Sequence, residues 1–340
     1  MKRGILLASL AFSVASALTP ISAFAANNLF QEYIGDYGVS TSGWGSVSTS
    51  DGTVAATVPV GSTVTAAYLY TSTWDFSAPF DPSGTTFQGS PISLTPLGVN
   101  SSACCNLQGW RADVTSLVAP VINGGPGGTY DFSLTEANTT QQDGEALVVV
   151  YSNPSQSTQT VAILNGFASS SGDTSVVNFS KPLDTSAPGF FAHMAIGDGF
   201  SCCDQESTIS VNGKEMTTVA GNNDSSVDAS PADGNLITMG NINGPYTGGT
   251  PGFPQTDYSA DHEAYDLVPF LSDGETTIKI DTINASHDDN IFVEVYDVSG
   301  EGHFVPGTPE PSTWVMLVIG FAGLGYAARR KGLALRSVQA

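Results

Sequence analysis

The chain has 340 residues and a formal net charge of −22 at pH 7, from 32 acidic and 10 basic side chains. So large an excess of negative charge opposes binding to nucleic acids and to anionic membrane surfaces, and it favours solubility and divalent cations. The length is sufficient for two domains of ordinary size.

The first 25 residues have the three parts of a secretory signal peptide. Lys2 and Arg3 form a positive start, residues 4–17 are apolar, and Ala23-Phe24-Ala25 is a small-residue cleavage site. This pattern predicts export and the removal of residues 1–25 by signal peptidase. Residues 26–308, which remain when the C-terminal tail described below is also removed, hold 31 acidic and 4 basic side chains, a net charge of −27.

Short runs of β-branched and aromatic residues, separated by Gly, Ser, Thr, Asn and Asp, predict an all-β fold with many turns. Residues 64–70 and 161–167 are two such runs. Residues 129–134 alternate between apolar and polar side chains and indicate a half-buried strand, whereas residues 145–152 are largely apolar and indicate a central strand. Intrinsic disorder, the alternative for so polar a composition, is disfavoured by these strands.

The second half of the chain repeats the order of segments in the first half. The corresponding segments are 64–70 and 190–196, 111–118 and 264–271, 128–134 and 274–280, and 143–151 and 289–296. The repeat predicts tandem antiparallel β-sandwiches, jelly-roll-like in type, over residues 26–168 and 169–304. The alternative is one large sandwich, because β-sandwiches can exceed 200 residues.

The four cysteines form two adjacent pairs, Cys104-Cys105 and Cys202-Cys203. Export to an oxidising compartment favours disulfides. Adjacent side chains in a strand point to opposite faces, so we expect two bonds that link one pair to the other. Bonds within each pair and a zinc–thiolate site are the alternatives, although adjacent cysteines lack the usual two-residue gap of zinc ligands.

No motif for a serine hydrolase, a metalloprotease, a P-loop or a dinucleotide-binding fold occurs in the sequence. Asp261-His262-Glu263 resembles part of a metal or acid–base cluster, but Asp266 stands where a metalloprotease helix requires its second histidine. We therefore predict no catalytic residues and interpret the protein as non-enzymatic. A glycosidase with two carboxylates is an alternative, because sequence spacing does not reveal their separation.

Calcium is the metal that the loops favour, because it prefers oxygen ligands. The candidate ligands are Asp198, Asp204, Asp224, Asp288 and Asp289. Ordinary turn chemistry of Asp and Asn is the alternative explanation for these clusters. Trp74, which lies among loop residues, is the candidate platform for a sugar ring, whereas Trp110 is expected in the core.

The C-terminal tail, residues 305–340, reads as a membrane-sorting segment. Pro309-Glu310-Pro311 precedes the uncharged run 314–328, and Arg329-Arg330-Lys331 follows it. As a helix the run is roughly 22 Å long, short of a hydrocarbon core of about 30 Å, but snorkelling arginines extend it. The three cations predict a cytoplasmic C-terminal end for this transmembrane helix.

These three parts, in this order, resemble a PEP-CTERM sorting signal, the substrate tail of exosortase-type membrane enzymes. The resemblance implies transient anchoring in the inner membrane of a Gram-negative bacterium, cleavage near Pro309-Glu310-Pro311, and release to the cell surface or extracellular matrix. Residues 64–167 are similar to uncharacterised β-rich modules of bacterial surface proteins, and residues 287–292 are similar to segments of other proteins with such sorting tails. Neither resemblance brings catalytic residues with it.

The sequence therefore predicts an exported, non-enzymatic surface or matrix protein that is associated with exopolysaccharide in a biofilm. Its expected partners are signal peptidase, an exosortase-type enzyme and extracellular polysaccharide, but no nucleic acid. A calcium-assisted carbohydrate-binding protein and a secreted glycan hydrolase are the two alternatives.

Overall fold

The computed structural model describes residues 27–46, 49–100, 106–168, 172–199, 207–221, 237, 239–256, 263–284 and 291–305. These residues form the strands β1 to β19, a single α-helix and a short 3-10 helix, and every named strand ladder is antiparallel. The prediction of an all-β fold is confirmed. In the described parts of the chain, no helix has both the length and the apolar character to cross a membrane. The predicted signal peptide and the predicted transmembrane helix lie outside the described residues.

Two five-stranded sheets form the middle of the molecule. Sheet A has the order β1 (Asn28–Gly35), β11 (Gln159–Asn165), β18 (Ile291–Ser299), β13 (Ala192–Asp198) and β16 (Ala264–Asp266). Sheet B has the order β2 (Tyr37–Trp44), β10 (Gln142–Ser152), β4 (Thr63–Thr73), β8 (Leu107–Asp113) and β7 (Thr95–Asn100).

Two further sheets cover the middle pair from outside. Sheet C has the order β3 (Asp51–Val58), β9 (Gly128–Thr135), β5 (Thr86–Phe87) and β6 (Ser90–Pro91). Sheet D has the order β15 (Lys214–Ala220), β14 (Ser207–Val211), β17 (Thr277–Asn284), β12 (Thr174–Phe179) and β19 (Gly302–Val305). The helices are α1 (Thr115–Ile122) and the 3-10 helix η1 (Val268–Phe270).

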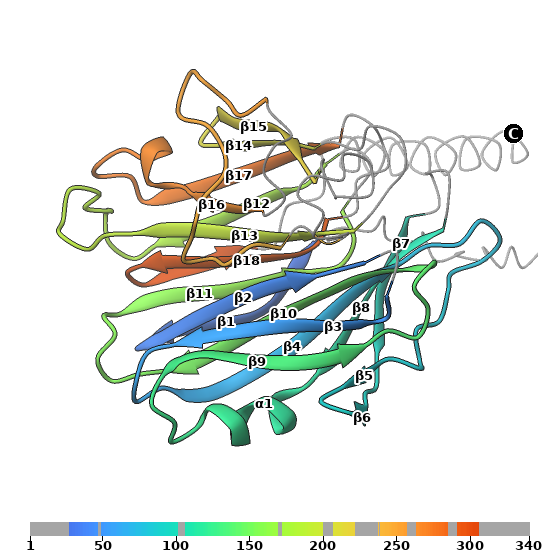
Figure 1. Ribbon diagram of the computed structural model, residues 1–340. Helices are drawn as coiled ribbons and strands as arrows, with labels where there is room; N and C mark the ends of the chain where they lie inside the picture. The colour runs from blue at the N-terminus through green and yellow to red at the C-terminus, as the bar shows by residue number, and fades with distance from the viewer. Residues whose placement is uncertain are drawn as a thin grey trace, which may run out of the picture.

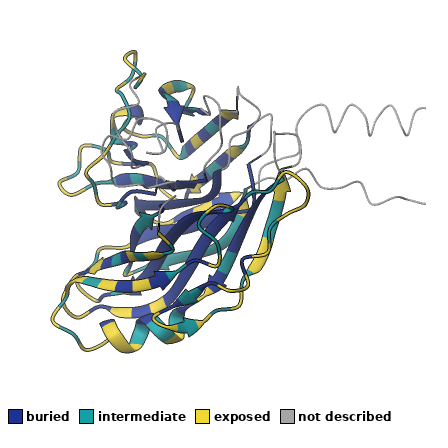
Figure 2. Ribbon diagram, turned by 45° about the vertical axis from the view of Figure 1, so that its right-hand side comes forward, coloured by how far each residue is buried: buried dark blue, intermediate teal, exposed yellow. Residues whose placement is uncertain are grey.

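The sheets stack face to face in the order D, A, B and C, from top to bottom in Figure 1. Three apolar clusters lie between successive layers: one joins sheets D and A, one joins A and B, and one joins B and C with α1. Sheets A and B therefore contribute side chains to a core on both faces. Figure 2 shows the result, with buried residues concentrated along the inner strands.

This layering explains the burial patterns along the strands. In β10, Leu147 and Val149 face sheet C, and Val148 and Val150 face sheet A, so the strand has no solvent-facing side. In β9 only alternate residues, such as Phe132 and Leu134, are buried, because sheet C is an outer layer. The predictions of a central strand at 145–152 and a half-buried strand at 129–134 are confirmed.

The repeated sequence segments occupy corresponding places. In sheet B, β10 lies between β2 and β4, with β8 beyond β4; in sheet A, β18 lies between β11 and β13, with β16 beyond β13. A short helix follows in each half: α1 follows β8, and η1 follows β16. The next strand then joins an outer sheet, where β9 pairs with β3 and β17 pairs with β12. The division into sandwiches at residue 168 stays a prediction, and β1 and β11 pair within sheet A beside strands from the second half.

The segment 111–118 is part strand and part helix. The backbone N–H of Thr115 donates to Oδ1 of Asp113 over 2.9 Å, which turns the chain at the end of β8. Helix α1 then places Val118 and Ile122 in the core between sheets B and C. The helix is short, so its apolar period is hard to distinguish from the alternation of a strand.

Candidate functional site

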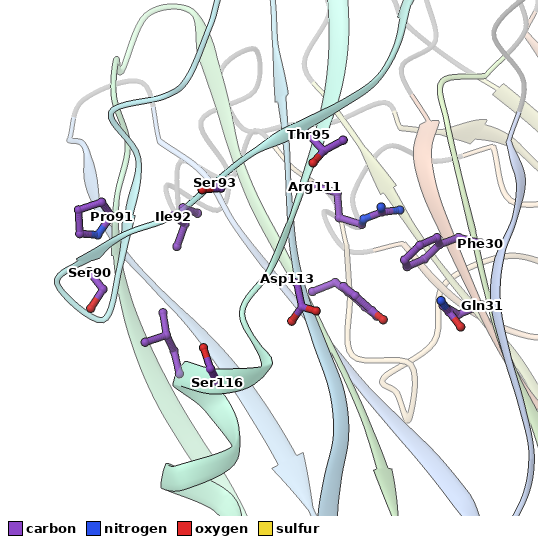
Figure 3. A pocket seen from close by; sticks show the side chains of 12 residues that line it. Phe30, Gln31, Ser90, Pro91, Ile92, Ser93, Thr95, Arg111, Asp113 and Ser116 are labelled. Carbon is purple, nitrogen blue, oxygen red and sulfur yellow. The ribbon is translucent and has the colours of Figure 1, made fainter.

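A pocket of about 600 Å³ opens beside β1. Its walls come from β1, from the face of β4 and β8 that sheet A leaves uncovered there, and from the segment between β5 and β7 (Figure 3). The start of α1 closes it with Ser116 and Leu117. We refer to it as the Phe30 pocket, and its volume is in the range of small-ligand sites.

An aromatic and cationic stack forms one side of the Phe30 pocket. The guanidinium carbon of Arg111 lies 3.5 Å from the centre of the Phe30 ring and 5.9 Å from that of the Tyr68 ring. The two rings meet edge to face, with their centres 5.1 Å apart. This cation–π arrangement holds the guanidinium in one orientation at the pocket wall (Figure 3).

Hydroxyl and charged groups line the rest of the pocket. Asp113 lies two residues from Arg111 on the same strand, opposite Tyr68 in the β4–β8 ladder, and its side chain is exposed. The hydroxyls come from Ser90, Ser93, Thr95 and Ser116. An aromatic wall with a carboxylate, a guanidinium and several hydroxyls suits a ligand that has an apolar face and many hydroxyl groups.

The sequence prediction named Trp74, which lies elsewhere. Its ring is half-buried, packs against the core between sheets A and B, and meets Phe76 edge to face at 5.2 Å. Phe76 is 73% exposed, so the outer surface of this pair is mainly Phe76. Trp110 is buried, and its indole N–H donates to Oγ1 of Thr73 over 2.9 Å, which confirms the prediction that Trp110 is a core residue.

The Phe30 pocket was missed because its parts are far apart in sequence. One local signal could have found it: Arg111 is one of only four basic residues in 26–308, and Asp113 shares its strand face. An isolated cation in so acidic a region is an unusual residue. The other wall, Phe30, arrives through the pairing of β1 with β11, which no local pattern reveals.

A second aromatic cluster lies in sheet A. His193 of β13 stacks on Phe191 and Tyr246, with ring centres 5.2 and 4.8 Å away, and the Tyr246 hydroxyl lies 2.9 Å from His193 Nε2. Burial lowers the pKa of His193, and the nearby Asp266 opposes this. The imidazole is therefore neutral at pH 7, and the cluster serves as an uncharged, partly exposed surface.

The predicted calcium ligands are mostly outside the described residues. Asp198 is buried at the end of β13, whereas Asp204, Asp224, Asp288 and Asp289 are not described. Within the described ranges, no three His, Cys, Asp or Glu side chains are grouped to hold a metal. The calcium prediction for these five residues is untested.

The other sequence-predicted positions are also untested. Cys104, Cys105, Cys202 and Cys203 lie outside the described residues, as do Pro309, Glu310, Pro311, Arg329, Arg330 and Lys331. Of the Asp261-His262-Glu263 cluster, only Glu263 is described, and it is buried.

Comparison with known proteins identifies the tail. The family described as PEP-CTERM protein-sorting motif matches residues 308–331, which span the Pro-Glu-Pro, the apolar run and the basic cluster. The resemblance seen in the sequence is confirmed, and the motif indicates an exported protein that an exosortase-type enzyme processes. No curated protein and no solved structure matches the chain.

Proposed function

We propose that this PEP-CTERM protein is a non-enzymatic component of the extracellular matrix that binds neutral exopolysaccharide in the Phe30 pocket. The sorting motif at residues 308–331 is the observation that carries the proposal, because it directs the chain to the surface on which such polysaccharides accumulate. Signal peptidase removes residues 1–25, and the sorting enzyme cleaves near Pro309-Glu310-Pro311.

The pocket chemistry supports a sugar ligand. The C–H face of a pyranose fits against the stack of Arg111 and Phe30, while Asp113 accepts and the edge of the Arg111 guanidinium donates hydrogen bonds to ring hydroxyls. Charge-assisted hydrogen bonds of this kind are about twice as strong as neutral ones. The serine and threonine hydroxyls of the rim add weaker contacts.

The net charge supports a neutral rather than an acidic glycan. Residues 26–308 carry −27, so a polyanionic chain meets repulsion over distances up to the Debye length, about 8 Å at physiological salt. A neutral polysaccharide meets no such barrier. This charge also keeps the protein chains apart from one another within a matrix.

The test is co-sedimentation of the mature protein with exopolysaccharide from the producing organism, with and without a calcium chelator. Asp113→Asn and Ser116→Ala change the pocket, and Asp131→Asn is the control, because Asp131 is an exposed acid on β9. We expect Asp113→Asn to weaken binding by about tenfold, the equivalent of one charged hydrogen bond. The control variant binds like the wild type.

Other outcomes separate the alternatives. Binding that chelation abolishes supports the calcium-assisted lectin, and shortened glycan products support the hydrolase. Unchanged binding in both pocket variants refutes the Phe30 pocket as the binding site. A chain with Glu310→Ala tests the sorting step separately, because we expect it to stay in the membrane fraction.

A further inference from the structure

The core between sheets B and C becomes acidic at one end. On β9, the inward-facing residues Phe132 and Leu134 are followed at the same spacing by Glu136. On β10, the inward-facing Leu147 is preceded at the same spacing by Glu145. Because side chains alternate along a strand, both carboxyl groups enter the layer between the two sheets.

Both carboxyl groups are shielded from water. Glu145 is 0% exposed and Glu136 is 4% exposed. The polar residues around them, Thr71, Thr85 and Gln142, are buried as well, and Thr71 lies directly opposite Glu145 in the β4–β10 ladder. These residues form a cluster of buried polar side chains within an otherwise apolar core, and we refer to this cluster as the polar chamber.

Hydrogen bonds satisfy only part of this chamber. Nε2 of Gln142 donates to Oε1 of Glu145 over 2.6 Å and to Oγ1 of Thr85 over 3.0 Å. The backbone N–H of Ala137 donates to Oε1 of Gln142 over 3.0 Å. In the described part of the chain, Oε2 of Glu145 and both carboxyl oxygens of Glu136 have no hydrogen-bond partner.

Three unpartnered oxygens on two buried acids are costly, because each has lost its hydration. Burial, together with the charges of Glu145 and Asp143, raises the pKa of Glu136 to about 10. Burial raises the pKa of Glu145 to about 8, although the Gln142 hydrogen bond opposes this. Because the three buried oxygens have no hydrogen-bond donor, either protons or a cation must serve as their partners.

We propose that Glu136 and Glu145 bind a calcium ion between sheets B and C. Apart from Nε2 of Gln142, which faces Glu145, the polar side-chain atoms of the chamber are oxygens: those of the two carboxylates, the hydroxyls of Thr71 and Thr85, and the amide oxygen of Gln142. Calcium takes six to eight oxygen ligands in flexible geometry and accepts bidentate carboxylates, whereas zinc favours nitrogen and sulfur. The proposed site has only two carboxylates, supplemented by neutral oxygens. It is therefore not one of the groups of three or more His, Cys, Asp or Glu side chains, which are absent from the described residues.

The ion joins two layers of the fold. Glu136 follows the last residue of β9 in sheet C, and Glu145 belongs to β10 in sheet B. Calcium that bridges them fastens the outer sheet to the inner one at the end where the apolar core stops. This site is distinct from the Phe30 pocket and does not depend on glycan binding.

The test measures calcium bound per chain of mature protein after equilibrium dialysis. Glu136→Gln and Glu145→Gln keep the side-chain shape and remove the charge, and Asp131→Asn removes an exposed charge from β9 as the control. We expect each Gln variant to bind one calcium ion fewer than the wild type and the control. Calcium at a hundred times its Kd raises the Tm of the wild type by about 5 °C, and the Gln variants lack this increment.

Equal calcium binding in the wild type and both Gln variants overturns the proposal. The proposal is also overturned if a Gln variant is more stable than the wild type at neutral pH and responds to calcium as the wild type does. Glu136 and Glu145 are then neutralised by protons and not by calcium. Adding magnesium in place of calcium separates specific calcium binding from a general effect of divalent charge, since magnesium requires stricter octahedral geometry. An equal rise in Tm with magnesium also counts against the proposal.

A second measurement works if the Gln variants fail to fold. Trp44 lies opposite Glu145 in the β2–β10 ladder, near enough to sensitise the luminescence of Tb³⁺ bound in the chamber. We expect tryptophan-excited Tb³⁺ luminescence in the wild type that calcium quenches by competition and that Trp44→Phe strongly reduces. Luminescence that Trp44→Phe leaves unchanged places the ion elsewhere and refutes the site.

Discussion

The side-chain amide of Asn27 donates a hydrogen bond of 2.9 Å to Oε1 of Glu294, which lies 267 residues away in the chain. Glu294 belongs to β18, the central strand of sheet A, and is 1% exposed. The hydroxyl of Tyr296 donates to the other carboxyl oxygen. The segment just before β1 is therefore fastened to the middle of sheet A through a buried acid.

Asn27→Ala is expected to destabilise the protein by about 1–3 kcal/mol. The substitution leaves one oxygen of a buried carboxyl group without its donor, and such an unsatisfied group costs about that much. Urea denaturation of the mature protein measures the change in the free energy of unfolding. The double variant Asn27→Ala/Glu294→Gln is the control: if both variants lose the same stability, the carboxyl oxygen left without its donor is not the cause.

Asp297 makes the stability fall as the pH rises. Burial raises the pKa of Asp297 to about 8, far above its value of about 3.9 in an unfolded chain. The folded state therefore favours the protonated acid. The contribution of Asp297 to the free energy of unfolding is greatest below about pH 4, decreases as the pH rises to about 8, and stays constant above that.

Asp297→Asn removes this dependence. Gln159 donates to Oδ1 of Asp297 over 3.0 Å, and the asparagine oxygen can accept the same bond. We expect the variant to exceed the wild type in stability at pH 9 by at most about 6 kcal/mol, and to match it near pH 4. Thermal unfolding across this pH range measures the difference. A constant difference at all pH values contradicts the assignment to Asp297.

Leu147→Ala tests the core between sheets B and C. Leu147 is fully buried in a strand with no solvent-facing side, so the cavity can close only by moving a packed sheet. We expect a loss of about 2–5 kcal/mol in the free energy of unfolding, measured by urea denaturation. Val121→Ala on α1 is the control, because Val121 is 47% exposed. A similar loss in both variants contradicts the layered core.

A cut between residues 168 and 172 tests the predicted division into two sandwiches. Strand β11 precedes the cut but pairs with β18, and the apolar cluster between sheets A and B joins the two fragments. We expect the fragments of a chain with a protease site at 169–171 to remain together in size-exclusion chromatography. Two folded fragments that separate show that the halves fold independently.

The repeat illustrates how far local sequence goes. Segments 143–151 and 289–296 are alike, and residues 143–151 and 291–296 lie in β10 and β18, interior strands of two different sheets. Their apolar content predicts that both faces of each strand are covered, because a strand with a solvent-exposed face alternates between apolar and polar side chains. The local sequence does not specify which strands pair with these two. For example, β11 pairs with β18 although it belongs to the first predicted sandwich.

Export and sorting, the all-β class and the central position of residues 145–152 could be predicted from the sequence, since these depend on composition and on patterns between near neighbours. The contact of Phe30 with Arg111, and the shared core of Glu136 and Glu145, became visible only in the folded chain. Those contacts join strands far apart in sequence, and their geometry follows from sheet pairing and layer packing, which alternation along a single strand does not specify.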